Sequence, residues 1–240
     1  RDVVLGGSFA AGSASAVGQA KTKAGLAGFF SGCLIDFVYP EIGEAVFKAV
    51  RALGWEITMP LAQGCCGYPA WVLEMPQAVA RMARQNLTAF SEAGVNKIIT
   101  ACPTCALTLK KIYPEVLRDD PEWAEKARIL AAGVSDIASF ALTCMGDKLT
   151  RRLANGKYLS ASSLPAVLAG ENRVTYHDPC HLRRSLGVYR EPRAIIEIFG
   201  LNIQEMTRPD ACCGFGGSYT LKFPALSAGI LERKLADIAA

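Results

Sequence analysis

The residues with the clearest chemistry are cysteines, and two stretches of the chain place a pair of them directly before a glycine. The first stretch is Gly64-Cys65-Cys66-Gly67, and the second contains Cys212-Cys213-Gly214. Thiolates bind soft metals, act as nucleophiles or form disulfides. A disulfide within either pair is disfavoured, because neighbouring Cα atoms lie only about 3.8 Å apart, closer than a relaxed disulfide prefers. Metal binding or thiol chemistry is therefore the favoured use.

The spacing of these cysteines occurs twice. Cys180, Cys212 and Cys213 follow Cys33, Cys65 and Cys66 at a constant interval of 147 residues, and the same interval relates Gly67 to Gly214. The first set continues with a C-x-x-C pair, Cys102 and Cys105, whose counterparts would fall beyond Ala240. The chain therefore contains an internal duplication in which the second copy of the motif is incomplete.

Each motif cysteine is expected to follow the carboxyl end of a strand. The expected strands are 26–32, 55–59, 96–100, 173–176 and 202–206, and the expected helices are 41–53, 76–93, a segment after Pro103, 191–199 and 224–238. This alternation favours an α/β fold of two related, duplicated strand-helix units with largely parallel sheets. Loops converge at the carboxyl edge of such sheets, so cysteines remote in sequence should meet there. Helix starts beside Cys33 and Cys102 would favour thiolates.

The expected domain organisation follows from this pattern. Residues 1–24, rich in Ala, Gly and Ser, are expected to be a linker or disordered arm. Residues 25–119 form the first expected cysteine domain, 120–170 a helical connector, and 171–240 the second, incomplete domain. The connector contains two expected helices, 121–133 and 134–149. Cys144 lies outside both motifs and is expected to be a small buried hydrophobe.

Composition excludes several classes of function. The 240 residues carry a net charge of only +4 without a long basic run, which argues against a nucleic-acid partner. No apolar run approaches the roughly 18 residues of a membrane span. Nine cysteines without an export signal favour a cytoplasmic protein with metal or thiol chemistry over a disulfide framework. The chain begins at Arg1 rather than Met, as expected of a fragment or a processed chain.

The number of clustered thiols favours iron and sulfide. Structural zinc takes four ligands, commonly from closely spaced pairs, whereas the first set here has five cysteines over long intervals. Iron–sulfur clusters are held by cysteine thiolates and vary in their number of iron atoms. Gly67 and Gly214 would let the backbone approach and donate N–H groups to sulfur. Zinc binding and a thiol redox or structural role stay open as alternatives.

The only two histidines, His177 and His181, flank Cys180. Imidazole can bind metal or titrate near neutral pH, but we expect both rings to orient the turn or to hydrogen-bond the backbone or a sulfur. Asp178 is expected to cap the following helix. For Arg183 and its neighbour Arg184, three roles stay open: balancing cluster charge, clamping a carboxylate, or lying on a solvated helix face.

With its two double-cysteine boxes, the chain resembles the cysteine-rich CCG domain family of heterodisulfide reductase. The phrases DPCHLRRSLGVYREPR and CCGFGGSYTLKFPALS resemble the iron–sulfur subunits of flavin-linked lactate and glycolate dehydrogenases, and the likeness covers about Leu26 to Ile238. It implies a noncubane [4Fe-4S] cluster held by Cys33, Cys65, Cys66, Cys102 and Cys105. Cys180, Cys212 and Cys213 would form part of a second site, which lacks its C-x-x-C, so a second cluster stays open.

The resemblance further implies a redox subunit that relays electrons from a flavoprotein 2-hydroxy-acid dehydrogenase to a quinone or another carrier. Relatives of the glycolate type also carry a ferredoxin-like region, and a ferredoxin-like domain or subunit is therefore a further expected partner. Such a complex could associate with the inner face of the membrane through its partners. Two alternatives stay open: a subunit that cleaves a disulfide at the cluster, as in heterodisulfide reductase, and a zinc-binding or structural module.

Overall fold

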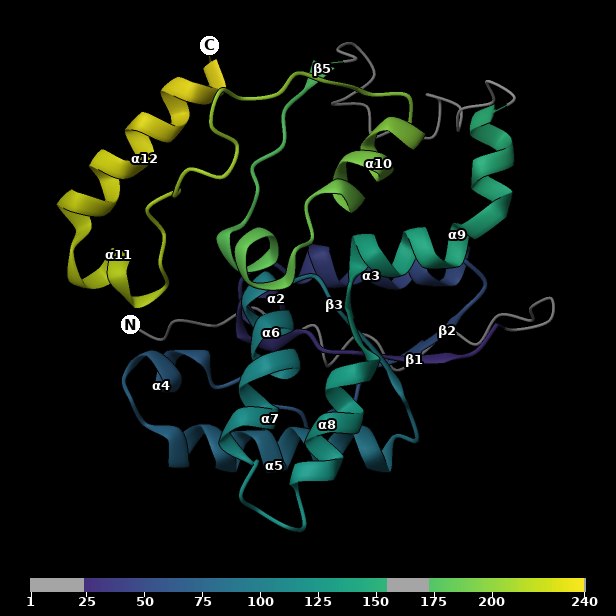
Figure 1. Cartoon of the computed structure of the whole chain (residues 1–240), viewed down its shortest axis with the longest axis vertical. Coiled ribbons are helices and arrows are strands. Elements are labelled where there is room, and N and C mark those ends of the chain that lie inside the picture. The colour runs from purple at the N-terminus through teal and green to yellow at the C-terminus, as the bar shows by residue number, and fades with distance from the viewer. Residues whose placement is uncertain (1–23, 155–172, 240) are drawn as a thin grey trace, which may run out of the picture. The chain divides into compact units, whose positions relative to one another are not determined.

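The computed structural model describes residues 24–154 and 173–239 and divides after Phe140 into two compact units (Figure 1). The expected arm lies outside the described residues except for Ala24, and so does most of the second half of the expected connector. Both units combine helices with parallel strands, which confirms the α/β class. The predicted domain boundaries at 119/120 and 170/171 stay predictions.

A four-stranded parallel sheet forms the centre of the first unit, in the order β2-β1-β3-β4. Its strands are β1 (Leu26–Phe29), β2 (Glu56–Thr58), β3 (Lys97–Thr100) and β4 (Val134–Asp136). Gly28 is paired with Thr58 on one side and with Ile98 on the other. Because β1 lies between β2 and β3, the three strands that precede cysteines end side by side at one edge of the sheet.

Helices connect these strands, and proline stands at the start of several of them, where its missing N–H is tolerated. They are α2 (Gly32–Phe37), α3 (Pro40–Ala52), α4 (Tyr68–Val72), α5 (Pro76–Glu92), α6 (Pro103–Leu107), η1 (Thr108–Ile112), α7 (Tyr113–Val116) and α8 (Ala124–Gly133). Helix α9 (Ile137–Ala154) follows β4 and begins in the first unit, but most of it belongs to the second. Figure 1 shows α3 on one side of the sheet and α5, α7 and α8 on the other. The predicted helices 41–53 and 76–93 correspond to α3 and α5.

Aromatic contacts anchor helices on both faces of β1. Phe29 meets Phe47 of α3 edge-on at 5.7 Å between ring centroids, whereas Phe30 stacks on Phe90 of α5 at 6.0 Å. Gly28 allows α5 to approach the strand, because a Cβ atom there would lie 2.8 Å from the Phe90 ring. The end of β1, and with it the start of the Cys33 loop, is therefore fixed by packing from two sides.

One expected helix begins later than the sequence predicts. The sequence predicts helix from residue 134, but Val134–Asp136 form β4, paired in parallel with β3. Val134 is β-branched and only 1% exposed, which suits a buried strand. Asp136 Oδ1 then accepts the N–H groups of Ala138 and Ser139 and caps the first turn of α9. The first half of the expected connector thus belongs to the first unit.

The second unit repeats the arrangement on a smaller scale. Its elements are β5 (Arg173–Val174), η4 (His181–Ser185), α10 (Arg190–Ile198), β6 (Asn202–Ile203), α11 (Ser218–Lys222) and α12 (Pro224–Ala239). Strands β5 and β6 are parallel, with Val174 opposite Ile203. Among the described residues, Leu182, Ile198 and Met206 are its most buried apolar side chains.

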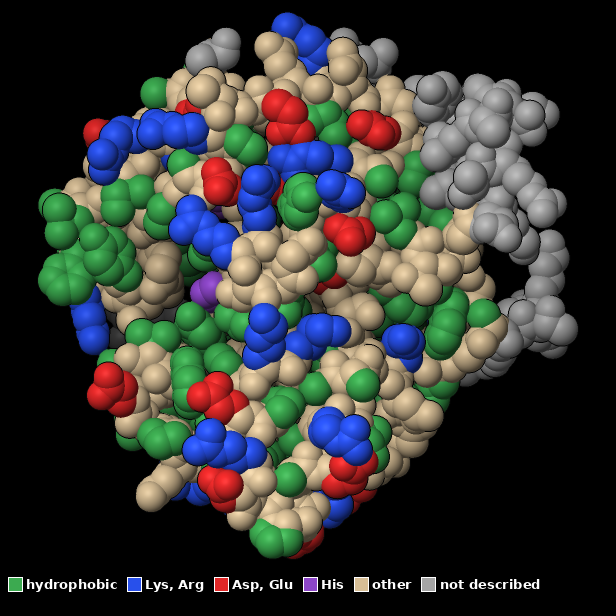
Figure 2. All heavy atoms as spheres, viewed as in Figure 1, with side chains coloured by type: hydrophobic (Ala, Val, Ile, Leu, Met, Phe, Trp, Pro, Cys, Tyr) green, Lys and Arg blue, Asp and Glu red, His purple; other side chains and the backbone are tan. Residues whose placement is uncertain are grey.

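Charged and apolar side chains share the molecular surface. Figure 2 shows Lys and Arg side chains interspersed with Asp and Glu on one face. In the first unit, exposed apolar residues such as Phe37, Leu61 and Val72 lie on or near the cysteine-bearing loops. Within the described parts of the chain, no helix combines the length and the apolar character needed to cross a bilayer.

Candidate functional site

Five thiols of the first unit lie together at the carboxyl edge of its sheet. Side-chain hydrogen bonds join them in the order Cys33, Cys65, Cys66, Cys105, Cys102. Cys33 comes from the loop after β1, the adjacent pair from the loop after β2, and the C-x-x-C pair from the start of α6 after β3. We call this connected set the thiol chain.

Exposure along the thiol chain is greatest at Cys33 and least at Cys66 and Cys105. Cys33 is exposed, Cys65 and Cys102 are partly buried, and Cys66 and Cys105 are each only 4% exposed. A group bound by these sulfurs would therefore be open to solvent or a partner at the Cys33 end and shielded by protein near Cys105.

Two members of the thiol chain are strongly acidic. Hydrogen bonds from Cys33 and Cys66, together with a backbone N–H, lower the pKa of Cys65 to about 2, although burial acts against this. A hydrogen bond from Cys105, assisted by backbone N–H groups, lowers the pKa of Cys102 to about 6. Cys65 and Cys102 are thus thiolates at neutral pH, the form that binds metals.

The other three thiols keep their protons because they donate to these thiolates. The hydrogen bond to Cys65, and burial, raise the pKa of Cys33 above its ordinary value. Contact with Cys105 favours the Cys66 thiolate, but donation to Cys65 and burial outweigh it and raise the pKa of Cys66 to about 12. Donation to Cys102 likewise raises the pKa of Cys105. Metal binding to all five sulfurs would release these protons.

The backbone next to the thiol chain donates N–H groups to the sulfurs and leaves room for them. Gly67 donates its N–H to Cys65 Sγ over 3.4 Å and has φ of 91°, a conformation that favours glycine. The Tyr68 N–H bonds to Cys66. Gly32 has φ of 66°, and a Cβ atom there would lie 2.7 Å from Cys105 Sγ. A side chain at Gly32 would therefore displace a sulfur.

This donor set fits an iron–sulfur cluster. Cysteine thiolates supported by backbone N–H groups are the ligands and neighbours that such clusters use. Within residues 24–154 and 173–239, no three His, Cys, Asp or Glu side chains are gathered around a point that would hold one metal ion. Cys33 interacts electrostatically with Cys66 and Cys102 as well as with Cys65, so the five thiols form one group. Five sulfurs are more than a single tetrahedral metal ion takes, and they suit a group that contains several metal atoms.

A buried amide on α5 holds the double-cysteine loop. Asn86 is fully buried; its Oδ1 accepts the Gly64 N–H at 2.8 Å, and its Nδ2 donates to the Cys65 carbonyl at 3.1 Å and to Tyr113 Oη at 2.7 Å. Asn86 was not predicted from the sequence. The available signal was its position between Ala83 and Phe90 on the apolar stripe of the helix, where a polar residue needs an internal partner.

The second unit repeats the glycine contact but not the thiol chain. Gly214 donates its N–H to Cys212 Sγ over 3.3 Å with φ of 83°, as Gly67 does to Cys65. Cys180 and Cys212 are exposed, and Cys213 is partly buried. In the described part of this unit, no side-chain hydrogen bond joins the three thiols. Cys144, expected to be buried, is only partly so on α9.

The two histidines lie beside Cys180 in partly buried positions. His177 Nδ1 lies 3.0 Å from the Pro209 carbonyl, which can only accept, so the ring links the Cys180 loop to the loop that carries Cys212. Burial, with a smaller effect of Lys234, lowers the pKa of His177. Burial also lowers the pKa of His181. Both rings are therefore neutral at pH 7.

Asp178 does not cap a helix as expected from the sequence. Its carboxylate is 1% exposed and accepts hydrogen bonds from Arg183 and from Arg193, the latter at 2.7 Å. Burial would raise the pKa of Asp178, but the hydrogen bonds from Arg193 and Arg183 outweigh it and lower that pKa. The guanidinium groups of the two arginines thus take the place of the backbone N–H groups that a helix cap would bind. Of the three roles considered for Arg183, it clamps a carboxylate.

Helix α12 occupies in the second unit the position that α5 has in the first. A Cβ atom at Gly67 would meet Met82 of α5, and one at Gly214 would meet Ile230 of α12. These equivalent contacts align Met82 of α5 with Ile230 of α12 when the two helices are compared.

The apolar face of α12 is open where that of α5 is covered. In the register just given, Ala83 and Leu87 correspond to Leu231 and Leu235. The first two are 0% and 4% exposed, whereas the second two are 44% and 53% exposed. In the first unit this face is covered by β3 and the helices that follow it.

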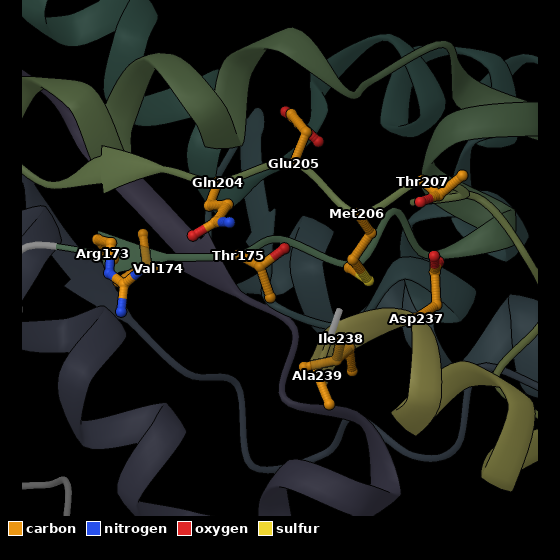
Figure 3. Close-up of a pocket in the computed structure, with 10 residues that line it drawn as sticks. All are labelled: Arg173, Val174, Thr175, Gln204, Glu205, Met206, Thr207, Asp237, Ile238 and Ala239. Carbon is orange, nitrogen blue, oxygen red and sulfur yellow. The ribbon is translucent and has the colours of Figure 1, made fainter.

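A cavity of about 470 Å³ lies within the second unit, next to the last residues of α12. Figure 3 shows its lining from β5, from the segment after β6 and from the end of α12, with Thr175, Met206 and Ile238 around it. Among the described residues β5 pairs only with β6, while β1 of the first unit pairs with β3 on its other edge. The described part of the second unit therefore has no counterpart of β3.

Known proteins share both units of the chain, including the duplicated cysteine loops. Residues 27–110 and 174–240 match the CCG family, described as a cysteine-rich domain. The chain belongs to the CCG cysteine-rich domain family. The two matched segments contain both double-cysteine boxes of this CCG chain, and the resemblance to the family predicted from the sequence is confirmed.

Relatives of this CCG chain include lactate utilization protein A of Geobacillus thermodenitrificans, which is 33% identical over 210 residues, or 87% of this chain and 80% of that protein. Lactate utilization protein A of Geobacillus kaustophilus is 32% identical over the same coverage. The probable glycolate oxidase iron-sulfur subunit of Bacillus subtilis is 31% identical over 213 residues, or 88% of this chain and 44% of that protein.

The buried carboxylate of Asp178 provides a test of the second unit. Asp178→Ala removes the buried carboxylate that Arg183 and Arg193 share and should lower the free energy of unfolding by about 3 kcal/mol. Asp210→Ala is the control, because this side chain is 42% exposed and its arginine contacts measure 3.9 Å. Its expected loss is below about 1 kcal/mol. Urea unfolding followed by circular dichroism measures both, and equal losses would contradict the assignment.

Proposed function

We propose that this CCG chain is the iron–sulfur electron-transfer subunit of a flavin-linked 2-hydroxy-acid dehydrogenase of the lactate or glycolate type. The observation that carries the proposal is the thiol chain of the first unit. The names of the relatives supply the reaction class, since they refer to lactate utilization and to a glycolate oxidase iron-sulfur subunit. When bound, an iron–sulfur cluster accepts and passes on single electrons.

The ligands proposed for the first cluster are the five thiols Cys33, Cys65, Cys66, Cys102 and Cys105. The number of thiols brought together, and the resemblance to heterodisulfide reductase, support a noncubane [4Fe-4S] cluster, in which adjacent cysteines would bind different iron atoms. For a second site the proposed ligands are Cys180, Cys212 and Cys213. The proposal assigns the redox role to the first site, because the structure brings five thiols together there.

The surrounding residues would control charge and access. The N–H groups of Gly67 and Tyr68 point to sulfur and stabilise its negative charge, which favours the reduced state of a bound cluster. The buried Cys66 and Cys105 keep water from the inner end of the site. The exposed Cys33 offers the shortest approach for a redox partner.

The proposed partners follow from the reaction class. A flavoprotein dehydrogenase would deliver electrons, a ferredoxin-like domain or subunit would extend the relay, and a quinone or another carrier would accept them. The proposed complex would work in a reducing compartment such as the cytoplasm, where the thiols that bind the cluster stay reduced. Attachment to the inner face of the membrane would then be made through the partners.

Paired cysteine variants test the ligand assignment. Cys66→Ser should lose most of the iron and acid-labile sulfide bound after anaerobic purification, because it removes a sulfur from the middle of the thiol chain. Cys144→Ser, a matched change on α9 outside the motif, should retain the iron content of the unaltered protein. Equal loss from both variants, or no loss from Cys66→Ser, would contradict the assignment.

Electron delivery tests the relay itself. In anaerobic rapid mixing, a flavin-linked lactate or glycolate dehydrogenase with its substrate should reduce the cluster, seen as bleaching of its visible absorption. The dehydrogenase without substrate is the control. Absence of bleaching together with cluster-dependent cleavage of a disulfide would instead support a subunit of the heterodisulfide reductase kind.

A further inference from the structure

The side chain of Gln63 connects the two loops that begin the thiol chain. It lies two residues before Cys65, and its Oε1 accepts the N–H of Ser31, two residues before Cys33, at 3.1 Å. Its Nε2 donates to the carbonyls of Phe29 at 3.0 Å and Pro60 at 3.1 Å. The side-chain amide of Gln63 therefore binds the backbone on both sides of Phe30. It also binds the backbone of the loop that carries Gln63 itself.

These bonds replace strand pairing that has ended. Backbone pairing between β1 and β2 reaches Gly28 and Thr58, after which the chain turns away at Pro60. The Phe29 carbonyl and the Ser31 N–H then face a side of β1 where no strand of the described residues continues. The Gln63 amide supplies the donor and the acceptor that the next residues of β2 would have supplied. The end of β1 is thus held in extended geometry up to the start of α2.

The second unit makes the same connection with different chemistry. The interval of 147 residues that relates the cysteines maps Ser31 onto Asp178. The Asp178 N–H donates to the carbonyl of Pro209 at 3.0 Å, and Pro209 lies three residues before Cys212. In both units the amide two residues before the single cysteine is tied to the loop that carries the cysteine pair. A side chain makes the bond in one unit and a main-chain carbonyl in the other.

We propose that Gln63 is a positioning residue that fixes the Cys33 loop relative to the Cys65 loop, and so sets the first link of the thiol chain. Its effect on a bound cluster rests on the proposed function, whereas the loop contact itself does not. Cys33 depends on this contact because it is exposed and lies on α2, a helix of six residues with Leu34 and Phe37 exposed.

Gln85 provides a matched control. Its Nε2 donates to the Ala62 carbonyl at 2.9 Å, so it also binds the loop before Cys65, from an exposed position on α5. Among the described residues, it makes no hydrogen bond to the Cys33 loop. Loss of either glutamine removes support from the cysteine-pair loop, but only loss of Gln63 should free the Cys33 loop.

The first measurement is amide hydrogen exchange by NMR in metal-free protein. In Gln63→Leu, exchange of the Ser31 amide should be at least about fivefold faster, because a buried donor loses its acceptor. The Gly64 amide, held by Asn86, should keep its rate. In Gln85→Leu the Ser31 rate should not change. If Gln63→Leu does not fold, Gln63→Asn serves instead, since an amide one methylene shorter cannot reach both loops.

The second measurement uses anaerobically purified protein with its iron. Gln63→Leu should shift the EPR spectrum and the midpoint potential of the cluster, while Gln85→Leu should leave both unchanged. Equal spectra for Gln63→Leu and unaltered protein, or an unchanged Ser31 exchange rate, would overturn the positioning role. If unaltered protein binds no iron and sulfide, the proposed function fails, and the exchange rates still decide whether Gln63 holds the Cys33 loop.

Discussion

Repulsion between neighbouring sulfur charges is the constraint on which the rest of this structure depends. Thiolates in contact repel one another unless protons, metals or N–H dipoles lie between them. In the first unit, the protonated thiols Cys66 and Cys105 separate the thiolates Cys65 and Cys102, and backbone N–H groups supply further positive charge. Three parallel strands that end side by side bring these groups to one edge. Glycine stands where a side chain would collide with a sulfur, as at Gly32 beside Cys105.

The two units show which parts of this solution can vary. Both place a left-handed glycine after the cysteine pair and tie the preceding loop to a long helix. In the first unit the helix supplies the neutral amide of Asn86. At the equivalent position of α12 the second unit supplies Lys234, which is 3% exposed and donates to the carbonyls of Arg208 and Pro209. Both units thus share the conformation of this loop. They differ in the charge of the helix side chain that binds it, a neutral amide in one and an ammonium group in the other.

The sequence predicted the parts of the structure that depend on local pattern. The cysteine spacing, the strand ahead of each cysteine and the long helices could be predicted because apolar periodicity and duplication are visible along the chain. The strand β4 was taken for helix, since three residues carry little periodicity and pairing with β3 decides their conformation. Gln63 and Asn86 were missed because their partners lie 21 to 34 residues away, and only the fold shows which carbonyls they meet. Asp178 was assigned to a cap because the sequence does not show that the side chains of Arg183 and Arg193 turn toward its carboxylate.

X-ray absorption at the iron and zinc edges of anaerobically purified protein tests the central claim most directly, since it identifies the metal and the atoms around it. If the thiol chain holds one polynuclear cluster, the iron edge should show sulfur neighbours together with iron neighbours at short distance. Zinc surrounded by sulfur with no second metal nearby, or protein without metal when oxygen has been excluded throughout, would contradict the account.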